Sequence, residues 1–315
     1  MSELTGATKA ALEASSRSAF VVTADELIQM ELPERRLLLA PWLPAQGLVM
    51  VYAPRGVGKT YFALNVAYAV AAGGGFLGWE APDARKVLYL DGEMPANVMQ
   101  QRIADIRAAA GKVAIPDHFR VVTPDLQGDH GMPDLSTSVG QAALEQALEG
   151  IDLVVVDNIS TLCRRGVENE AESWFPVQEW ALRLRARGTS VLFVHHAGKG
   201  GTQRGTSKRE DILDTVINLK RPADYSPEQG AAFEVHFEKN RSFMGEDAEA
   251  LDVTLKQQQG RMIWDFRKVE ASNYRKVVEL AKDGVKQADI ARELDLNPST
   301  VSRHLRKAKG KRELS

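Results

Sequence analysis

Apolar residues in the first two thirds of the chain form short continuous runs that alternate with segments of helical spacing. The runs lie at residues 47–53, 86–90, 118–122, 151–156 and 190–194, and the helical segments at 59–72, 97–110, 139–148 and 174–187. Strands that are apolar along their whole length are buried on both faces, as in parallel sheets covered by helices. The pattern therefore predicts an α/β fold built on a mostly parallel sheet.

The alternation stops after residue 211. Four further apolar runs, at 214–219, 232–237, 251–256 and 262–266, follow one another through short connections. The QQQG sequence at 257–260 suits a hairpin turn. We expect these runs to form an antiparallel extension of the sheet.

Residues 274–309 have a helical pattern of their own. Residues 286–294 predict a short helix and 295–297 a turn. Residues 299–307 predict a second helix, with Asn297 as its N-cap and Pro298 at its first position. Val301 and Leu305 would face inward and the polar and basic residues outward, which is a helix-turn-helix layout. We therefore predict a disordered N-terminus (1–20), an α/β domain (21–268) and a small all-α helix-turn-helix domain (272–311).

Composition narrows the class of protein. The single cysteine, Cys163, rules out an intrachain disulfide and favours a reducing, cytoplasmic setting. No apolar run approaches the roughly 18 residues that a membrane span needs, so no membrane partner is expected. The whole chain has a formal charge of −2, yet residues 272–315 hold eleven Lys/Arg and six Asp/Glu. A basic end on an acidic body favours a nucleic-acid partner.

The turn between the first run and the first helix matches the Walker A pattern, except that Ala replaces its first glycine. Its glycines would let backbone N–H groups face phosphates, and the N-terminus of the helix would attract the same anions. Lys59 would neutralise the β- and γ-phosphates, and Thr60 would bind Mg²⁺. We therefore predict that ATP and Mg²⁺ bind at Ala53, Pro54, Arg55, Gly56, Val57, Gly58, Lys59 and Thr60.

Other polar residues follow the apolar runs, at the sheet edge where ligands of α/β proteins bind. Asp157 ends the fourth run as a Walker B acid and would hold Mg²⁺ with Thr60. Glu93, just after the second run, is the candidate base, and Asp91 is the alternative. One of His195 and His196 could sense the γ-phosphate; strand register decides which, and His195 is favoured.

With these motifs in place, residues 41–266 resemble RecA-like ATPases of the RepA type, the plasmid hexameric replicative helicases, and more distantly the DnaB and KaiC ATPases. The stretches that carry the resemblance are APRGVGKT, LYLDGEMP, LVVVDN and VHHAGKGGTQRGTS. The resemblance implies a RecA-like P-loop NTPase core that hydrolyses ATP between subunits of a homo-oligomer, a ring of six. It also implies that Glu93 is the catalytic glutamate, and that Lys239 and Arg241 form a basic finger reaching a neighbouring subunit. Arg204 is a rival finger.

Two segments are candidates for binding DNA. The glycine-rich basic loop after the fifth run would touch a single strand electrostatically, through Lys199, Arg204, Lys208 and Arg209. The outward face of the last helix would reach duplex DNA through Ser299, Thr300, Ser302, Arg303, Arg306 and Lys307. The loop at 160–173 is a further candidate for the single strand.

These features predict an ATP-dependent DNA helicase or translocase of the RepA type. The helix-turn-helix segment departs from a minimal helicase of that type. Two alternatives remain open: an ATP-controlled DNA-binding regulator that does not translocate, and a recombination or repair ATPase.

Overall fold

The computed structural model describes residues 21–32, 34–164, 171–197, 211–223, 225–311 and 313–314, and it describes no side chain at 171–173. The predicted disordered segment at 1–20 lies outside these residues. The chain divides into two units, 1–35 and 36–315. In the first unit, helix α2 (Ala24–Gln29) begins with a capping box between Thr23 and Glu26. The second unit contains all the elements described below.

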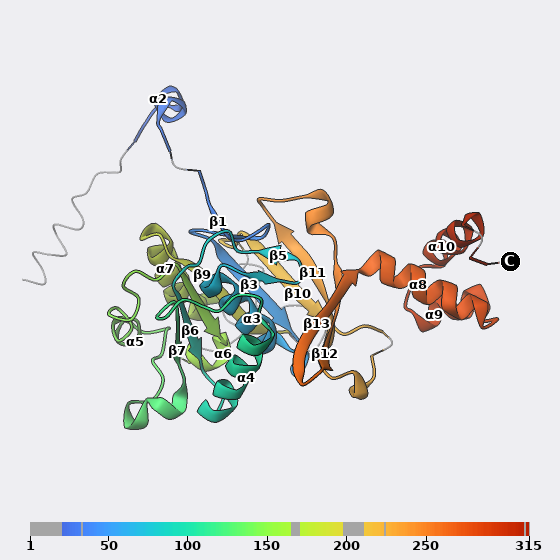
Figure 1. Ribbon diagram of the computed structural model, residues 1–315. Helices are drawn as coiled ribbons and strands as arrows, with labels where there is room; N and C mark the ends of the chain where they lie inside the picture. Colours follow the sequence, from blue (N-terminus) through green and yellow to red (C-terminus); the bar gives the residue numbers. More distant parts are fainter. Residues whose placement is uncertain are drawn as a thin grey trace, which may run out of the picture. The chain divides into compact units, whose positions relative to one another are not determined.

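A nine-stranded sheet forms the centre of the second unit, in the order β13-β12-β11-β10-β3-β9-β8-β6-β7 (Figure 1). Neighbours from β10 to β7 are parallel, and β10 to β13 pair antiparallel. The predicted mostly parallel sheet with an antiparallel extension is therefore confirmed. The strands are β3 (Leu48–Ala53), β6 (Val87–Asp91), β7 (Phe119–Val122), β8 (Leu153–Asp157), β9 (Ser190–His196), β10 (Thr215–Lys220), β11 (Ala232–Asn240), β12 (Leu251–Gln258) and β13 (Arg261–Lys268).

Strand β10 differs from its prediction as part of the antiparallel extension. It lies parallel to β3 on one side and antiparallel to β11 on the other. Its residues from Thr215 to Leu219 are all buried. Burial on both faces is what a parallel strand between two covering layers requires. The predicted hairpin is present: Gln259 and Gly260, both with positive φ, join β12 to β13.

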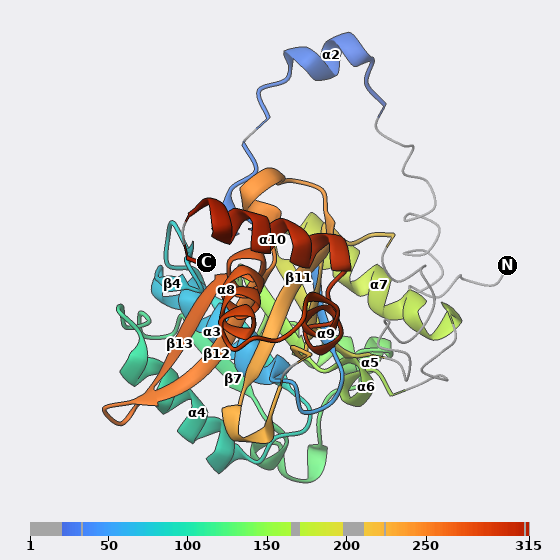
Figure 2. The same ribbon diagram turned by 90° about the vertical axis from the view of Figure 1, so that its right-hand side faces the viewer.

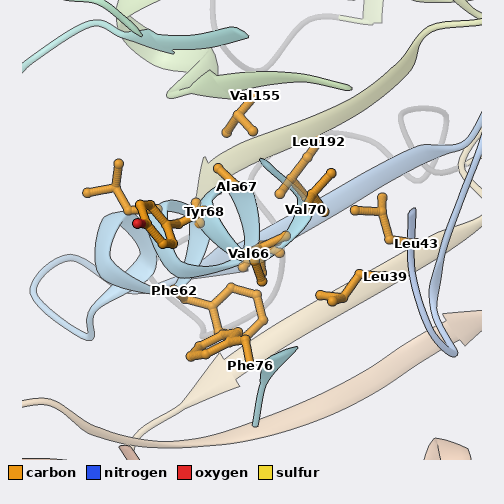
Figure 3. Close-up of a cluster of buried hydrophobic side chains, with 14 of the residues drawn as sticks. Leu39, Leu43, Phe62, Val66, Ala67, Tyr68, Val70, Phe76, Val155 and Leu192 are labelled. Atoms are coloured by element: carbon orange, nitrogen blue, oxygen red, sulfur yellow. The ribbon is translucent and has the colours of Figure 1, made fainter. Parts of the chain in front are cut away.

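Helices cover both faces of the parallel strands. Helix α3 (Lys59–Ala72) packs with β1 (Leu37–Leu39), β2 (Leu43–Pro44), β4 (Gly75–Phe76) and β5 (Trp79–Glu80) in one apolar cluster (Figure 3). The same cluster includes Met99 and Ile106 of α4 (Ala96–Ala109). The opposite cluster contains residues of α6 (Ile159–Leu162) and α7 (Ala171–Ala186).

The helix predicted over 139–148 is shorter than expected. Helix α5 (Ser138–Ala142) ends where i→i−3 hydrogen bonds, such as Leu144 N to the Gln141 carbonyl, interrupt the α-helical ladder. Leu144 and Leu148 are nevertheless buried in the same cluster as α7. The apolar spacing therefore predicted the buried face correctly but not the backbone. The remaining short elements among the described residues are the 3₁₀ turns Pro124–Leu126, Gly128–His130, Pro227–Gln229 and Gly245–Ala248.

The C-terminal segment consists of α8 (Val269–Lys282), α9 (Gln287–Glu293) and α10 (Pro298–Gly310), which pack on one another (Figure 2). Asn297 caps α10 by accepting a hydrogen bond from the Ser299 N–H, as predicted. Val301 is buried in their shared core, and Leu305 packs against it. The helix-turn-helix prediction is thus confirmed. Within the described ranges, no helix is long and apolar enough to cross a membrane.

The Phe62 ring contacts four other rings of the α3 cluster, and its removal tests the packing of this core. The side chain is fully buried against the rings of Trp42, Phe76, Trp79 and Phe233. We expect Phe62→Ala to lower the free energy of unfolding by about 3–5 kcal/mol, measured by urea denaturation, because it leaves a cavity. The matched control removes the 52% exposed ring of Phe175. That control should change stability by less than about 0.5 kcal/mol, and equal losses would contradict the packing described.

Candidate functional site

The phosphate cradle begins where β3 ends and α3 starts. Gly56 and Gly58 have φ of 75° and 123°, a backbone region that L side chains rarely adopt. A Cβ on Gly58 would also lie 3.2 Å from the Phe233 ring. Glycine is therefore needed at both positions, and the turn from Arg55 to Thr60 lines the pocket.

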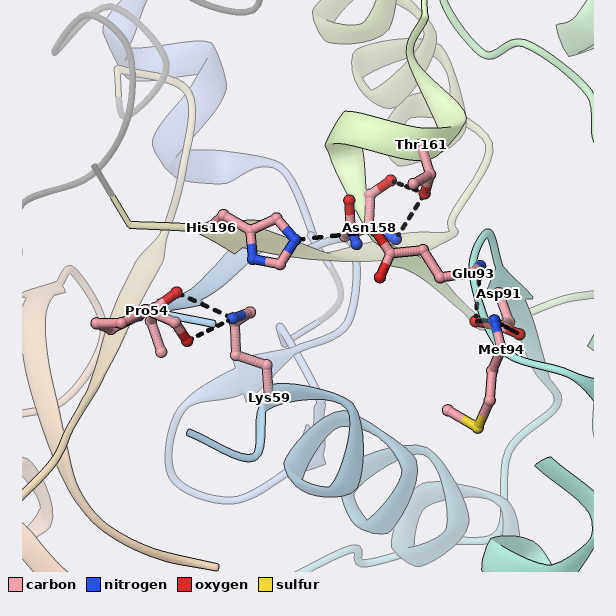
Figure 4. Close-up of polar contacts among 9 residues, drawn as sticks. Pro54, Lys59, Asp91, Glu93, Met94, Asn158, Thr161 and His196 are labelled. Carbon is pink, nitrogen blue, oxygen red and sulfur yellow. Dashed lines mark hydrogen bonds and ion pairs between the residues drawn. The ribbon is translucent and has the colours of Figure 1, made fainter. Parts of the chain in front are cut away.

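Lys59 places a buried cation at this turn. Its side chain donates hydrogen bonds from Nζ to the carbonyls of Ala53 (2.9 Å) and Pro54 (2.8 Å) (Figure 4). Burial lowers the pKa of Lys59 to about 8, although the carboxylates of Asp157 and Glu93 raise it. An anion on the cradle would favour the charged ammonium, so the residue suits a phosphate ligand. Ala53 and Pro54 contribute these carbonyls and do not line the pocket.

Asp157 and Thr60 lie next to one another beside Lys59. The buried carboxylate of Asp157 accepts hydrogen bonds from the hydroxyls of Thr60 and of Tyr89, the latter at 2.7 Å. Burial raises the pKa of Asp157, and these two hydrogen bonds oppose the rise. Mg²⁺ prefers oxygen ligands and is usually bound by one or two carboxylates together with substrate phosphates. The Thr60 and Asp157 oxygens fit that ion.

One cavity of about 580 Å³ brings the predicted groups together. Six of the eight predicted nucleotide-binding residues, Arg55 to Thr60, line this cavity. Glu93, Asp157 and His196 line it as well. Glu93 comes from the turn after β6, Asp157 from the end of β8 and His196 from the end of β9. Asp91, the alternative base, is only 2% exposed and does not line the cavity. Position therefore favours Glu93 over Asp91 as the group that can meet a ligand.

The structure directs His196, and not the favoured His195, toward the nucleotide pocket. His196 Nε2 lies 3.9 Å from Glu93 Oε1 (Figure 4). His195 precedes it on β9 and is fully buried, and successive side chains of a strand point to opposite faces. The preference for His195 was therefore wrong: the alternation of side chains along β9 turns His196, and not His195, toward the cavity.

The sequence analysis missed five residues that line the cavity: Tyr61, Arg102, Asn158, Gly230 and Ala231. The Arg102 guanidinium lies over the ring of Tyr61, 4.7 Å from its centroid, and both side chains line the cavity. Tyr61 directly follows the Walker A motif, but Arg102 comes from α4. A flat cation stacked on a ring is a surface on which a base could stack. The helical spacing of α4 contained no signal for this contact.

Arg221 was also missed, and it contacts the cradle without lining the cavity. It follows β10 and donates a hydrogen bond of 3.0 Å to the Gly56 carbonyl, while its guanidinium lies over the Tyr225 ring. The connection between β10 and β11 therefore braces the outer side of the cradle. Gly230 and Ala231 of the same connection line the cavity.

The finger residues lie away from this cavity. Lys239 is part of β11, and Arg241 follows the strand directly. The predicted finger therefore begins within a strand and not in a loop. Asn240 pairs with Thr215, which pairs with Val49 at the amino end of β3. The finger therefore lies at the amino ends of the parallel strands, whereas the cradle of the same chain lies at their carboxyl ends. The basic loop residues Lys199, Arg204, Lys208 and Arg209 lie outside the described residues, as does part of the loop at 160–173.

The DNA-binding candidates on α10 separate into two sets. Arg303 and Lys307 face α8: Arg303 lies 3.6 Å from the Glu270 carboxylate, and Lys307 lies over the Tyr274 ring. The expectation that both point straight outward was thus only partly correct, because α8 supplies an acid and a ring beside them. Exposed or half-buried positions away from these contacts are Ser299, Thr300, Ser302 and Arg306, together with Lys309, which the sequence analysis did not select.

Comparison with known proteins covers both parts of the chain. Residues 11–202, more than half of the sequence, match the AAA domain family, and residues 271–311 match sigma-70 region 4. A KaiC-like protein from Pyrococcus horikoshii aligns with a TM-score of 0.48 and 16% identity, over 74% of this chain and 99% of that chain. The flagellar accessory protein FlaH from Methanocaldococcus jannaschii aligns with a TM-score of 0.47 and 11% identity, over 70% and 90%. The AAA domain match includes the cradle, Glu93, Asp157 and His196.

The lowered pKa of Lys59 predicts proton uptake when ATP binds. Above its pKa of about 8 the residue is partly neutral without ligand, and phosphate charge should restore its proton. Calorimetry of Mg·ATP binding at about pH 9, in buffers of different ionisation enthalpy, should therefore show net uptake. The titration uses the Glu93→Gln variant, so that little ATP is hydrolysed while binding is measured. The uptake should fall strongly at about pH 7, where Lys59 is already charged; an equal heat in all buffers at the higher pH would contradict the assignment.

Proposed function

This chain belongs to the AAA domain family, and we propose that its ATPase core acts on DNA as a helicase or translocase. The observation that supports hydrolysis most is the single cavity that contains the cradle, Lys59, the Thr60–Asp157 pair and Glu93. The support for action on DNA is the resemblance to RepA-type helicases together with a basic C-terminal helix-turn-helix.

The pocket residues predicted from the sequence have distinct roles in the proposed hydrolysis. Backbone N–H groups of the cradle bind the phosphates, and Lys59 neutralises charge that develops on them. Thr60 and Asp157 would hold Mg²⁺, which adds positive charge beside the β- and γ-phosphates when bound. Glu93 orients the attacking water and accepts its proton. His196, which lines the same cavity 3.9 Å from Glu93, would sense the γ-phosphate by hydrogen bonding.

Assembly would complete the site. Lys239 and Arg241 cannot serve the cavity of their own chain, because they lie at the amino end of the parallel strands. A finger supplied by a neighbouring subunit is typically worth 10³- to 10⁵-fold in turnover. We therefore propose that the active form is a homo-oligomeric ring, and we retain six as the number of subunits that the sequence resemblance implies.

A second function is favoured by a specific observation. Residues 271–311 match sigma-70 region 4. Helix α10 presents to solvent a stripe of polar and basic residues, Ser299, Thr300, Ser302, Arg306 and Lys309. An ATP-controlled regulator would use this stripe to bind duplex DNA and would use ATP to change its assembly state. No described contact favours the recombination or repair ATPase over these two.

Steady-state hydrolysis with and without single-stranded DNA separates the two functions. A motor should be stimulated several-fold by single strands, and Lys59→Ala should remove all activity because the phosphates lose their buried cation. Strand displacement should then require ATP and should be lost in Glu93→Gln. Slow hydrolysis that does not respond to single strands would contradict the motor and favour the duplex-binding regulator.

The stripe on α10 predicts which arginines bind duplex DNA. Arg306 is exposed away from α8, so Arg306→Ala should weaken duplex binding by about 1–3 kcal/mol if it meets a base edge, measured by fluorescence anisotropy at fixed salt. The matched control is Arg275→Ala, on α8, which removes the same charge from the same segment and should have a smaller effect. An equal loss in both variants would show that only net charge matters.

A further inference from the structure

The turn that carries Glu93 is held tightly at the carboxyl edge of the sheet. Its Gly92 N–H donates a 2.7 Å hydrogen bond to the Asp157 carbonyl, which ties the turn to β8. A Cβ on Gly92 would lie 2.2 Å from Thr161 Oγ1 in α6. The turn is thus pressed between β8 and α6, and its backbone conformation determines where the Glu93 side chain can reach.

Asp91 holds the same turn from within. Its carboxylate accepts hydrogen bonds from the N–H groups of Met94, at 3.0 Å, and Glu93, at 3.3 Å (Figure 4). Thr123, just after β7, lies on the other side: its hydroxyl is 3.3 Å from Asp91 Oδ2 and 3.0 Å from the Met94 carbonyl. Asp91 and Thr123 are 2% and 3% exposed. A buried polar group therefore connects the ends of β6 and β7 through the backbone of the turn.

We propose that Asp91 is a positioning residue for the reaction, acting through Glu93: together with Thr123 it fixes the turn so that the Glu93 carboxylate stands in the nucleotide cavity. The inference rests on the proposed ATP hydrolysis and assigns no contact between Asp91 and substrate. Asp91 does not line the cavity, and both of its oxygens already accept hydrogen bonds from the turn or from Thr123.

Burial supports this role. A carboxylate removed from water is unfavourable unless hydrogen bonds compensate it, and burial raises the pKa of Asp91 to about 6 while the N–H groups of Glu93 and Met94 lower it. The acid is thus stabilised by the very backbone groups that it orders. An apolar residue would remove the burial penalty but would leave those two N–H groups without this acceptor.

A double-mutant cycle in the full-length protein tests the proposal. The four proteins are wild type, Asp91→Ala, Glu93→Gln and the double variant, and the readouts are kcat, KM and Mg·ATP affinity. Misplacing a catalytic group by about 1 Å can cost about 10²-fold in rate, so Asp91→Ala should lower kcat by about that factor. Its ATP affinity should change less than about threefold, because the cradle is intact. In the Glu93→Gln background the same substitution should have almost no further effect on kcat.

Conservative and control variants guard against a merely structural effect. Asp91→Asn keeps one acceptor oxygen and should recover most of the lost rate, while Thr123→Val should give a smaller loss than Asp91→Ala and serves if that variant does not fold. Asp125→Ala removes a nearby carboxylate that accepts from Ala96 N–H at the start of α4; it should retain wild-type kcat.

Two results would overturn the positioning role. One is an equal fold-loss in kcat when Asp91→Ala is made in the wild type and in the Glu93→Gln variant, which would show that the two residues act independently. The other is a loss confined to ATP affinity. If the wild type itself hydrolyses no more ATP than Lys59→Ala, the proposed hydrolysis fails instead, and the cycle distinguishes that outcome at its first measurement.

Discussion

The complete burial of β3 is the constraint on which the rest of the structure depends. All six of its residues are buried, between β9 on one side and β10 on the other. Such a strand needs apolar cover on both faces, which α3 and its neighbours supply on one face and the cluster containing α7 on the other. Because β3 lies in the middle of the sheet, its carboxyl end opens into the cavity, and the chain must turn there within a few residues to begin α3.

Because these strands are parallel, the polar residues that follow them lie together at the carboxyl ends of the strands. Strands β3, β6, β8 and β9 all end at that edge of the sheet, so residues more than a hundred positions apart line one cavity. The buried Lys59 ammonium and the buried Asp157 carboxylate would each be unfavourable alone. Side by side they stabilise one another's charge, which explains why both can occupy the interior at the end of apolar strands.

The antiparallel extension contributes to both parts of the second unit. Phe233 of β11 packs under Gly58 and against Trp264 of β13, whose ring also meets Tyr61. Helix α8 starts directly after β13, and its buried Ser272 hydroxyl donates to Asp252 of β12. These strands thus support the nucleotide cradle through aromatic side chains and anchor the first helix of the C-terminal segment through a buried hydrogen bond.

The sequence by itself determined the features that depend on neighbouring residues along the chain. The apolar runs, the Gly-rich turn, the bounds of α3 and the Asn297 cap all follow from spacing and from local backbone preferences. Tertiary structure decided the rest: the parallel direction of β10, the choice of His196 over His195, and the contacts that separate Glu93 from Asp91. The pairing of Arg102 with Tyr61 and of Lys307 with Tyr274 belongs to the same group. Each of these depends on strand register or on a partner from a distant segment, and a one-residue change of register would reverse the face of every side chain in a strand.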